Sequence, residues 1–134
     1  MLLVRWRLPR KWSHAVTPAT PAAGSRGLPH PEPGQIRLEA VLHALADPVR
    51  LSIVRELAAD GDEFACSHFD LPVTKSTTTH HFRVLREAGV VRQAYRGTAK
   101  MNSLRREELD RLFPGLLDCL LRAAAGQAVR LGDG

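Results

Sequence analysis

The stretch from residue 76 to residue 91 decides the fold, and it reads Ser76-Thr-Thr-Thr-His-His-Phe-Arg-Val-Leu-Arg-Glu-Ala-Gly-Val-Val91. Thr78, Phe82 and Leu85 recur at helical spacing, which predicts a helix over 76–88 with these side chains facing inward. Gly89 suits the left-handed residue that ends such a helix. Two strand candidates follow at 90–95 and 99–104, joined by a turn at 96–98. A polar, basic helix therefore leads directly into a β-hairpin.

Three helices are expected before this stretch. Apolar residues at helical spacing between Leu38 and Leu45 predict the first helix. Asp47-Pro48 ends it and begins the second, because Asp is a good N-cap and Pro is tolerated at the first helical position. The second helix runs to 60–62, and a short third helix is expected from Cys66 to Leu71, before Pro72.

A last helix follows the hairpin, with a wide apolar stripe from Leu109 to Ala124. Pro114 should kink this helix or begin a second segment. The element order is then four helices, a hairpin and a terminal helix, with a short helix before the basic one. This order predicts a mainly α fold with a small β-hairpin, a winged helix-turn-helix.

The domain occupies residues 35–125. Residues 1–34 are rich in Pro, Gly and Arg and have no periodic apolar face, so we expect them to be disordered. Residues 126–134 are expected to be a flexible C-terminal tail. The two cysteines suggest no disulfide scaffold, and no apolar run is long enough for a signal peptide or a membrane span. We therefore expect a cytoplasmic protein without a membrane partner.

Charge is unevenly distributed along the chain. Of the net charge of +5, residues 1–34 carry +4, so net charge by itself is weak evidence for nucleic-acid binding. The segment 75–100 is more informative, since six Lys and Arg residues are opposed there by Glu87 alone. This local charge coincides with the basic helix and the hairpin.

Three segments of the chain resemble the ArsR family of bacterial repressors. Ala44-Leu-Ala-Asp-Pro-Val-Arg-Leu51 is similar to the helix-break-helix signature of that family, and 76–91 is similar to its recognition helix and entry to the wing. Arg96-Gly-Thr resembles the wing tip, so the resemblance spans about 36–121. It implies a homodimer, joined through the first and last helices, that binds a palindromic operator in double-stranded DNA.

The broad apolar stripes of the first and last helices agree with this, because they exceed what a domain of this size needs for its own core. The residues expected at the dimer interface are Leu38, Val41, Leu42, Leu109, Leu116, Leu117 and Leu120.

Polar side chains on the outer face of the basic helix and at the hairpin tip are the candidate DNA contacts. They are Lys75, Ser76, Thr77, Thr79, His80, Arg83, Arg96 and Lys100. The resemblance implies a different, structural role for His81.

Metal-binding members of the family have a Cys-x-Cys pair in the third helix, and here the sequence departs from them. Ala65 and Ser67 occupy the two ligand positions, with Cys66 between them, and no His follows His81 to build the alternative site on the terminal helix. Cys66 and His68 alone do not make a tetrahedral zinc site. We therefore expect no metal site and no cofactor.

The predicted function is a DNA-binding transcriptional regulator, a homodimeric repressor relieved by an unknown effector, such as a small molecule, and not a Cys-x-Cys metal sensor. Two alternatives stay open: a winged helix that binds a partner protein, and a thiol-based redox switch at Cys66. Cys119 lies beside the terminal stripe and is expected to pack at the interface. Adjacent residues such as His80 and His81 point about 100° apart on a helix, and no catalytic motif accompanies them, so we expect no enzyme.

Overall fold

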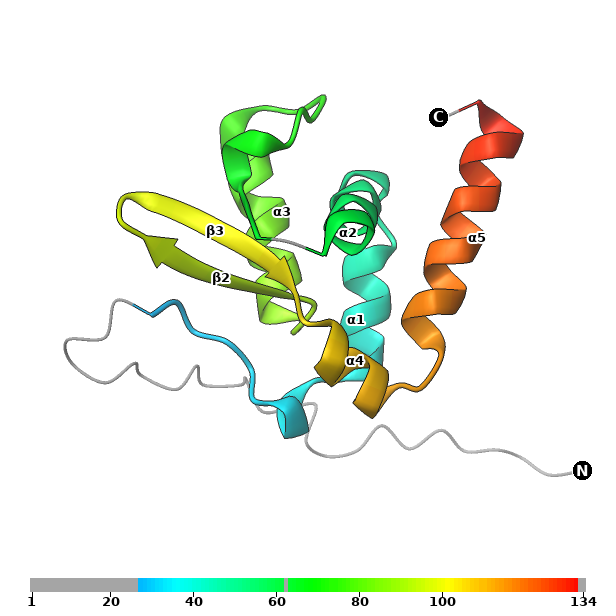
Figure 1. Ribbon diagram of the computed structural model, residues 1–134, viewed down its shortest axis with the longest axis horizontal. Coiled ribbons are helices and arrows are strands. Elements are labelled where there is room, and N and C mark those ends of the chain that lie inside the picture. The colour runs from blue at the N-terminus through cyan, green and yellow to red at the C-terminus, as the bar shows by residue number, and fades with distance from the viewer. Residues whose placement is uncertain (1–26, 62, 133–134) are drawn as a thin grey trace, which may run out of the picture.

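The computed structural model describes residues 27–61 and 63–132. Five α-helices and a three-stranded antiparallel sheet make up this part of the chain (Figure 1). The helices are α1 (Leu38–Leu45), α2 (Pro48–Asp60), α3 (Lys75–Glu87), α4 (Arg106–Leu112) and α5 (Leu116–Leu131). The strands are β1 (Phe64–Ala65), β2 (Val91–Arg96) and β3 (Ala99–Leu104), and short 3₁₀ helices occur at η2 (Pro33–Gln35) and η3 (Cys66–His68). The predicted fold class, mainly α with a β-hairpin after the basic helix, is confirmed.

The core lies where α1, α2 and α3 meet the base of the hairpin. Its largest fully buried side chains include Ile53 and Leu57 from α2 and Phe82 and Leu85 from α3. Phe82 and Leu85 are the inner stripe predicted from the sequence, whereas Thr78 at its start is only half-buried.

The predicted third helix, Cys66–Leu71, is wrong in most of its length. Only the 3₁₀ turn η3 forms there, and the two residues before it pair with β3 as β1, with Phe64 opposite Asn102. Two ring contacts accompany the shorter helix: the Phe64 ring stacks on His68 at 4.2 Å between centroids, and the Phe69 ring lies 5.4 Å from that of Phe82. The backbone of Phe69 is extended (φ −86, ψ 120), so the turn ends there and the Phe69 ring enters the core.

The C-terminal region divides at Pro114, one of the two outcomes expected. Helix α4 ends at Leu112 and α5 begins at Leu116, and the two axes differ by 110°. Helix α5 runs to Leu131, whereas a flexible tail was expected from residue 126. Among the described residues no single helix is long and apolar enough to span a membrane, and only the bent pair α4 and α5 together reaches that length and composition.

The N-terminal segment was expected to be disordered up to residue 34. Residues 1–26 lie outside the described part of the chain, as do 133 and 134 of the expected tail. Residues 27–34 follow a defined course beside β2, with hydrogen bonds to that strand and to Arg105. This part of the chain therefore departs from the expectation.

Candidate nucleic-acid interface

The recognition helix α3 is held against α1 and α2 by one buried arginine. Arg50 donates from Nε to the carbonyl oxygen of Ala44, at 2.7 Å, and its Nη1 lies 3.1 Å from Nδ1 of His81 on α3. Both side chains are buried. His81 is therefore a packed residue of the scaffold, as the family resemblance implied, and its ring does not face the solvent.

Asp47 fixes the start of α2, as predicted. Its carboxylate accepts hydrogen bonds from the backbone amides of Val49 and Arg50, at 2.8 and 3.1 Å. Burial raises the pKa of Asp47, but these two amides, with the charges of His81 and Arg50, outweigh it and leave the pKa below its ordinary value. Arg50, whose amide is one of these donors, lies in the first turn of α2, from which its side chain reaches His81 on α3.

The outer face of α3 is polar and basic. Lys75, Ser76, Thr79, His80 and Arg83 are all exposed, whereas Phe82 and Leu85 on the inner side are buried. Within the described residues, neither Lys75 nor Arg83 has an ion pair with a carboxylate. Six of the eight predicted contact residues belong to this helix, and the structure brings five of them onto one accessible face.

The sixth, Thr77, is half-buried and belongs to the cap of α3. Thr74 is the N-cap: its hydroxyl oxygen accepts a hydrogen bond from the backbone amide of Thr77, at 3.3 Å, and lies 2.8 Å from the Thr77 hydroxyl. The sequence analysis missed Thr74, although a threonine directly before a helix is itself an N-cap signal. Exposed Lys75 is the first residue of α3, and a cation beside a helix N-terminus is an arrangement that favours a phosphate.

The hinge between α3 and the wing requires glycine at position 89. Gly89 has φ +84, and the amides of Gly89 and Val90 donate to the carbonyl oxygens of Arg86 and Leu85, both at 3.0 Å. These two bonds form a Schellman motif. A Cβ at Gly89 would lie 2.6 Å from Cγ1 of Ile36, so the close approach of Ile36 also excludes a larger residue.

A buried chain of polar side chains sets the wing relative to α3. Arg86 of α3 donates to Oε1 of Gln93 on β2 (2.8 Å), and Gln93 donates to Oδ1 of Asn102 on β3 (2.7 Å). Asn102 in turn donates to the Phe64 carbonyl at 3.1 Å and lies 3.2 Å from the sulfur of Cys66. All three polar residues are buried, and the sequence analysis identified none of them as part of the site.

At the wing tip, Gly97 and Thr98 make the turn between β2 and β3, with Arg96 opposite Ala99. Arg96 is at the tip, as predicted, and its side chain is 70% exposed, but its guanidinium pairs with the Glu63 carboxylate at 2.8 and 2.9 Å. The Nζ of Lys100 lies 5.7 Å from the centre of the Tyr95 ring, within cation–π range. Both cations are thus near the tip, and Arg96 would exchange one anionic partner for another on binding a phosphate.

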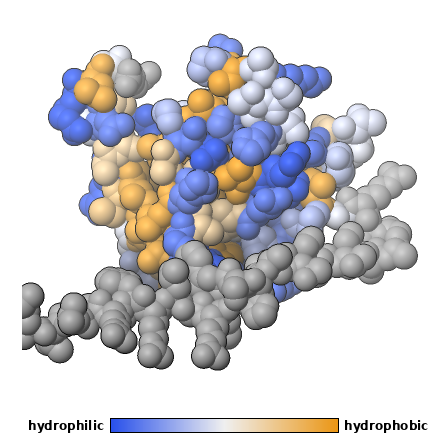
Figure 2. Space-filling model, turned by 180° about the vertical axis from the view of Figure 1, so that it is seen from behind, coloured by the Kyte–Doolittle hydropathy of each residue, from blue (hydrophilic) through white to orange (hydrophobic). Residues whose placement is uncertain are grey.

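The residues expected at a dimer interface divide into three groups. Leu38 and Leu42 on α1 are exposed by 42% and 43%, whereas Val41, Leu109 and Leu117 are buried in the core of the chain itself. Leu116 and Leu120 are half-buried and line a crevice between α1 and α5. Figure 2 shows apolar surface gathered on the side of the molecule where α5 lies. The three buried residues hold α4 and α5 onto α1 and are not open to a partner in this structure.

The two cysteines lie in different surroundings. Cys66 is half-buried beside Asn102, and Cys119 on α5 is exposed. Among residues 27–61 and 63–132, no group of three or more His, Cys, Asp or Glu residues is placed to hold a metal ion.

Known proteins resemble this chain in both sequence and fold. Residues 45–94 match the model of a helix-turn-helix domain. The uncharacterized HTH-type transcriptional regulator YceK of Bacillus subtilis (strain 168) is 35% identical over 88 residues, which cover 64% of this chain and 87% of that protein. The arsenical resistance operon repressor of the same organism is 31% identical over 87 residues, 64% of this chain and 83% of the relative.

A crystal structure of an ArsR family transcriptional regulator superimposes with a TM-score of 0.50 at 17% identity, covering 72% of this chain and 97% of that one. At that identity the likeness shows the fold alone. Helix α3, the wing and these sequence matches define a winged helix-turn-helix transcriptional regulator. The chain belongs to the ArsR family of these regulators.

Proposed function

We propose that this regulator is a homodimeric repressor that places α3 in the major groove of a palindromic operator and the wing against the flanking backbone. The exposed face of α3 carries the proposal. Hydroxyl, imidazole and guanidinium groups at Ser76, Thr79, His80 and Arg83 are those that hydrogen-bond to base edges and phosphates. Two copies related by a two-fold axis would read half-sites about one helical turn apart.

The first test is selection of bound duplexes from a random DNA library with the purified protein, followed by a salt titration on the enriched site. A two-fold symmetric consensus and steep salt dependence support the proposal, because phosphate contacts release counterions. Absence of enrichment with a folded dimer would refute it and favour a protein-binding role for the same surface.

The second test removes two of the side chains on the exposed face that can contact bases. The double variant His80→Ala/Arg83→Ala should lose at least about tenfold in operator affinity and keep its fold, since one good base contact is worth about 1–3 kcal/mol. Arg111→Ala is the matched control, because Arg111 is an exposed arginine on α4. If the double variant binds as tightly as the control, α3 is not the reading helix in this orientation.

Dimerisation is proposed through α1 and α5. The exposed leucines of α1, and Val129 (83% exposed) and Leu131 (64%) on α5, are apolar surface that association would cover. Leu38→Glu/Leu42→Glu should shift the protein to a monomer in sedimentation velocity, whereas Ala59→Glu, at an exposed position on α2, should not. A double variant that stays dimeric would place the interface elsewhere.

We also propose that the repressor acts in the cytoplasm and is released by an effector other than a metal held by a Cys-x-Cys pair. Ala65 and Ser67 have no sulfur at the two positions that such a pair needs. Release of operator DNA by arsenite or zinc at stoichiometric concentration would overturn this part of the proposal.

A further inference from the structure

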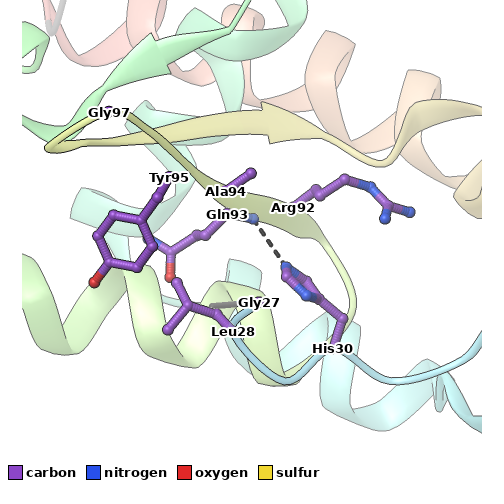
Figure 3. Close-up of a pocket in the computed structure, with 8 residues that line it drawn as sticks. All are labelled: Gly27, Leu28, His30, Arg92, Gln93, Ala94, Tyr95 and Gly97. Atoms are coloured by element: carbon purple, nitrogen blue, oxygen red, sulfur yellow. Dashed lines mark hydrogen bonds between the residues drawn. The ribbon is translucent and has the colours of Figure 1, made fainter. Parts of the chain in front are cut away.

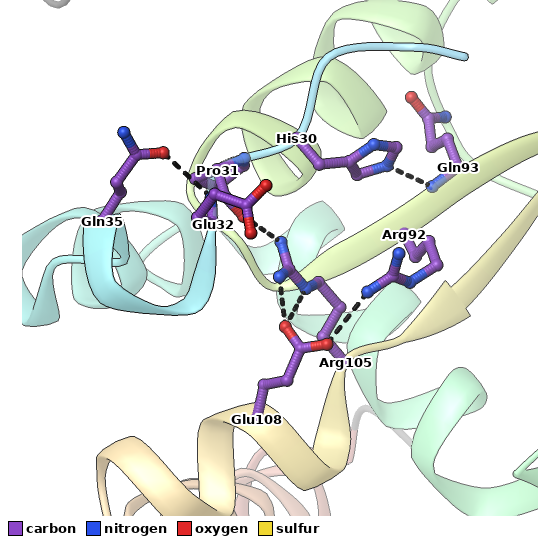
Figure 4. Close-up of polar contacts among 8 residues, drawn as sticks. All are labelled: His30, Pro31, Glu32, Gln35, Arg92, Gln93, Arg105 and Glu108. Atoms are coloured by element: carbon purple, nitrogen blue, oxygen red, sulfur yellow. Dashed lines mark hydrogen bonds and ion pairs between the residues drawn. The ribbon is translucent and has the colours of Figure 1, made fainter.

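Residues 27–35 lie along the outer edge of the wing. The described strands have the order β1-β3-β2, so the outer edge of β2 faces no other strand of this sheet. At this edge the amide of Gln93 donates to Nε2 of His30, at 2.9 Å (Figure 3). Arg105 donates to the carbonyl oxygen of Pro31, also at 2.9 Å (Figure 4). These two hydrogen bonds, at neighbouring residues of the segment, hold it to the domain.

The amide of Gln93 is an edge group of the sheet. In an antiparallel pair, residues alternate between those whose amides bond to the facing strand and those whose amides point away from it. Gln93 lies opposite Asn102 of β3, and its amide points outward, to His30. The amides of its neighbours Arg92 and Ala94 accordingly point to β3. The His30 ring therefore pairs with an amide that the sheet itself leaves without an acceptor.

The bond between Gln93 and His30 requires a neutral imidazole. A backbone amide can only donate, so Nε2 of His30 is the ring nitrogen that carries no proton. Protonation would place an N–H group on both ring nitrogens, and two donors would then face each other across this contact. The imidazolium form therefore cannot keep the bond.

The charged groups around the ring also disfavour the imidazolium form. Arg92 comes from β2, Arg86 from α3 and Arg105 from the chain directly after β3, and all three charges act on His30. Glu108 of α4 brings negative charge into the same region (Figure 4). Its two oxygens are already bonded, one to Arg105 at 2.6 Å and the other to Arg92 at 2.9 Å. A proton on the ring would thus meet cations whose nearest carboxylate is engaged.

The pKa of His30 agrees with this geometry. Burial lowers the pKa most, the hydrogen bond with the backbone of Leu28 raises it, and the three arginines lower it further. Glu32, the acidic residue of the same segment, is the N-cap of η2. Because the pKa lies below its ordinary value of 6.5, contact between the ring and the wing is fully favourable above pH 6.5 and weakens as the pH falls below that value.

The second bond of the segment does not titrate in this range. Arg105 keeps its charge, and the carbonyl oxygen of Pro31 accepts a hydrogen bond at any pH. Farther along, Ile36 belongs to the core. Loss of the His30 contact would therefore free residues 27–30 and leave the segment from Pro31 onward attached.

We propose that residues 27–30 are a proton-released flap, which lies on the edge of β2 at neutral pH and leaves it when His30 takes up a proton. The released state uncovers the Gln93 amide and the cleft that Leu28 shares with Tyr95 (Figure 3). A strand edge without a partner can pair with another chain. The outer edge of the wing is thus closed at neutral pH and open in acid. This inference does not depend on DNA binding.

The test measures hydrogen exchange of single backbone amides by NMR, on the full-length protein at about pH 7.5 and about pH 5.5. Protection factors remove the intrinsic pH dependence of exchange and report opening alone. Protection of Gln93 should fall by about two- to tenfold, because uptake of one proton changes an equilibrium by at most about tenfold per pH unit below pH 6.5. The control amides are Ala94, opposite Met101, and Arg105, which donates to the carbonyl oxygen of Val90 at 2.9 Å. Their protection should not change.

His30→Gln is the matched variant, because glutamine offers an uncharged oxygen acceptor the same number of bonds from Cα. It should protect Gln93 equally at both pH values. His30→Leu, which has no acceptor, should leave the Gln93 amide weakly protected at both. A loss of protection in His30→Gln as large as in the natural chain would overturn the proposal, because the fall would not come from this ring.

A second measurement decides the matter if the glutamine does not dock. In the natural chain, the pH midpoint at which Gln93 loses protection should coincide with the titration of the His30 ring followed by NMR. Two different midpoints, or constant protection of Gln93 over the whole range, would refute the flap. An equal loss at Ala94 and Arg105 would also refute it, since the whole wing would then open and not residues 27–30 alone.

Discussion

Replacement of Gly89 by alanine tests the hinge that connects the recognition helix to the wing. Two costs are expected. Left-handed backbone, at φ +84, costs a residue with a Cβ about 1–2 kcal/mol. The new Cβ would also lie 2.6 and 2.8 Å from two carbons of Ile36, and overpacking of this kind costs about 1–3 kcal/mol. Alanine also lowers the conformational entropy of the unfolded chain, which offsets a small part of these costs. We therefore expect the free energy of unfolding to fall by about 2–4 kcal/mol.

The two costs separate in a double-mutant cycle with Ile36→Ala. Without the Ile36 side chain the collision disappears, so Gly89→Ala should then cost only about 1 kcal/mol, leaving a coupling of about 1–3 kcal/mol between the two positions. Unfolding in urea, at one protomer concentration for all proteins, gives each free energy. The matched control is Gly126→Ala, in the middle of α5, where a Cβ would meet only Arg130 at 4.0 Å.

The control should be neutral or stabilising by up to about 1 kcal/mol, because alanine favours a helix more than glycine does. The reasoning is refuted if Gly89→Ala costs less than about 1 kcal/mol, or if its cost is the same with and without the Ile36 side chain. Either result would mean that the Ile36 side chain does not pack on Gly89. The contact that holds residue 36 beside the end of α3 would then be absent.

Three further perturbations test the scaffold and the bond between Gln93 and His30. Asp47→Ala should lower the free energy of unfolding by about 1–2 kcal/mol in urea titrations, since it removes the cap of α2, and Asp47→Asn should recover most of that loss. Arg50→Met should cost about 2–4 kcal/mol, because it leaves the buried carbonyl of Ala44 without its side-chain donor, and a loss below about 1 kcal/mol would contradict that role. Burial, and after it the charges of nearby arginines, hold the pKa of His30 below its ordinary value of 6.5. Its bond to Gln93 therefore stabilises the fold fully above about pH 6.5 and less as the pH falls below that value, so the stability difference between the natural protein and His30→Ala should shrink from about pH 7.5 to about pH 5.5. A difference that grows over this range would mean that the protonated ring is the better partner.

The amino-acid sequence by itself determined the local structure. The period of apolar residues located α1, α2 and α3, the Asp47-Pro48 pair marked the break between the first two helices, and Gly89 marked the end of α3. Each of these signals depends on residues within a few positions of one another, so it can be read without knowledge of the fold. The outer face of α3 followed for the same reason, since a helix with a known inner stripe has a known outer side.

Only the tertiary structure decided the partners of the polar residues. Arg50 meets His81, and Gln93 meets His30 across 63 positions of sequence. Likewise, Phe64 and Ala65 form a strand only because β3 offers them an edge, and two residues are too few to produce a period. The leucines of α1, α4 and α5 are a further case. Their apolar stripes are continuous in the sequence, but the fold buries some of these leucines and leaves others exposed.

The physical reason is that hydrogen bonds and burial between distant segments depend on which surfaces meet, and no spacing along the chain encodes that meeting. The sequence therefore predicted that the basic residues of α3 and the wing form a surface for DNA. The tertiary structure showed that Arg96 already has a carboxylate partner, and that the N-terminal segment follows β2 toward the wing tip.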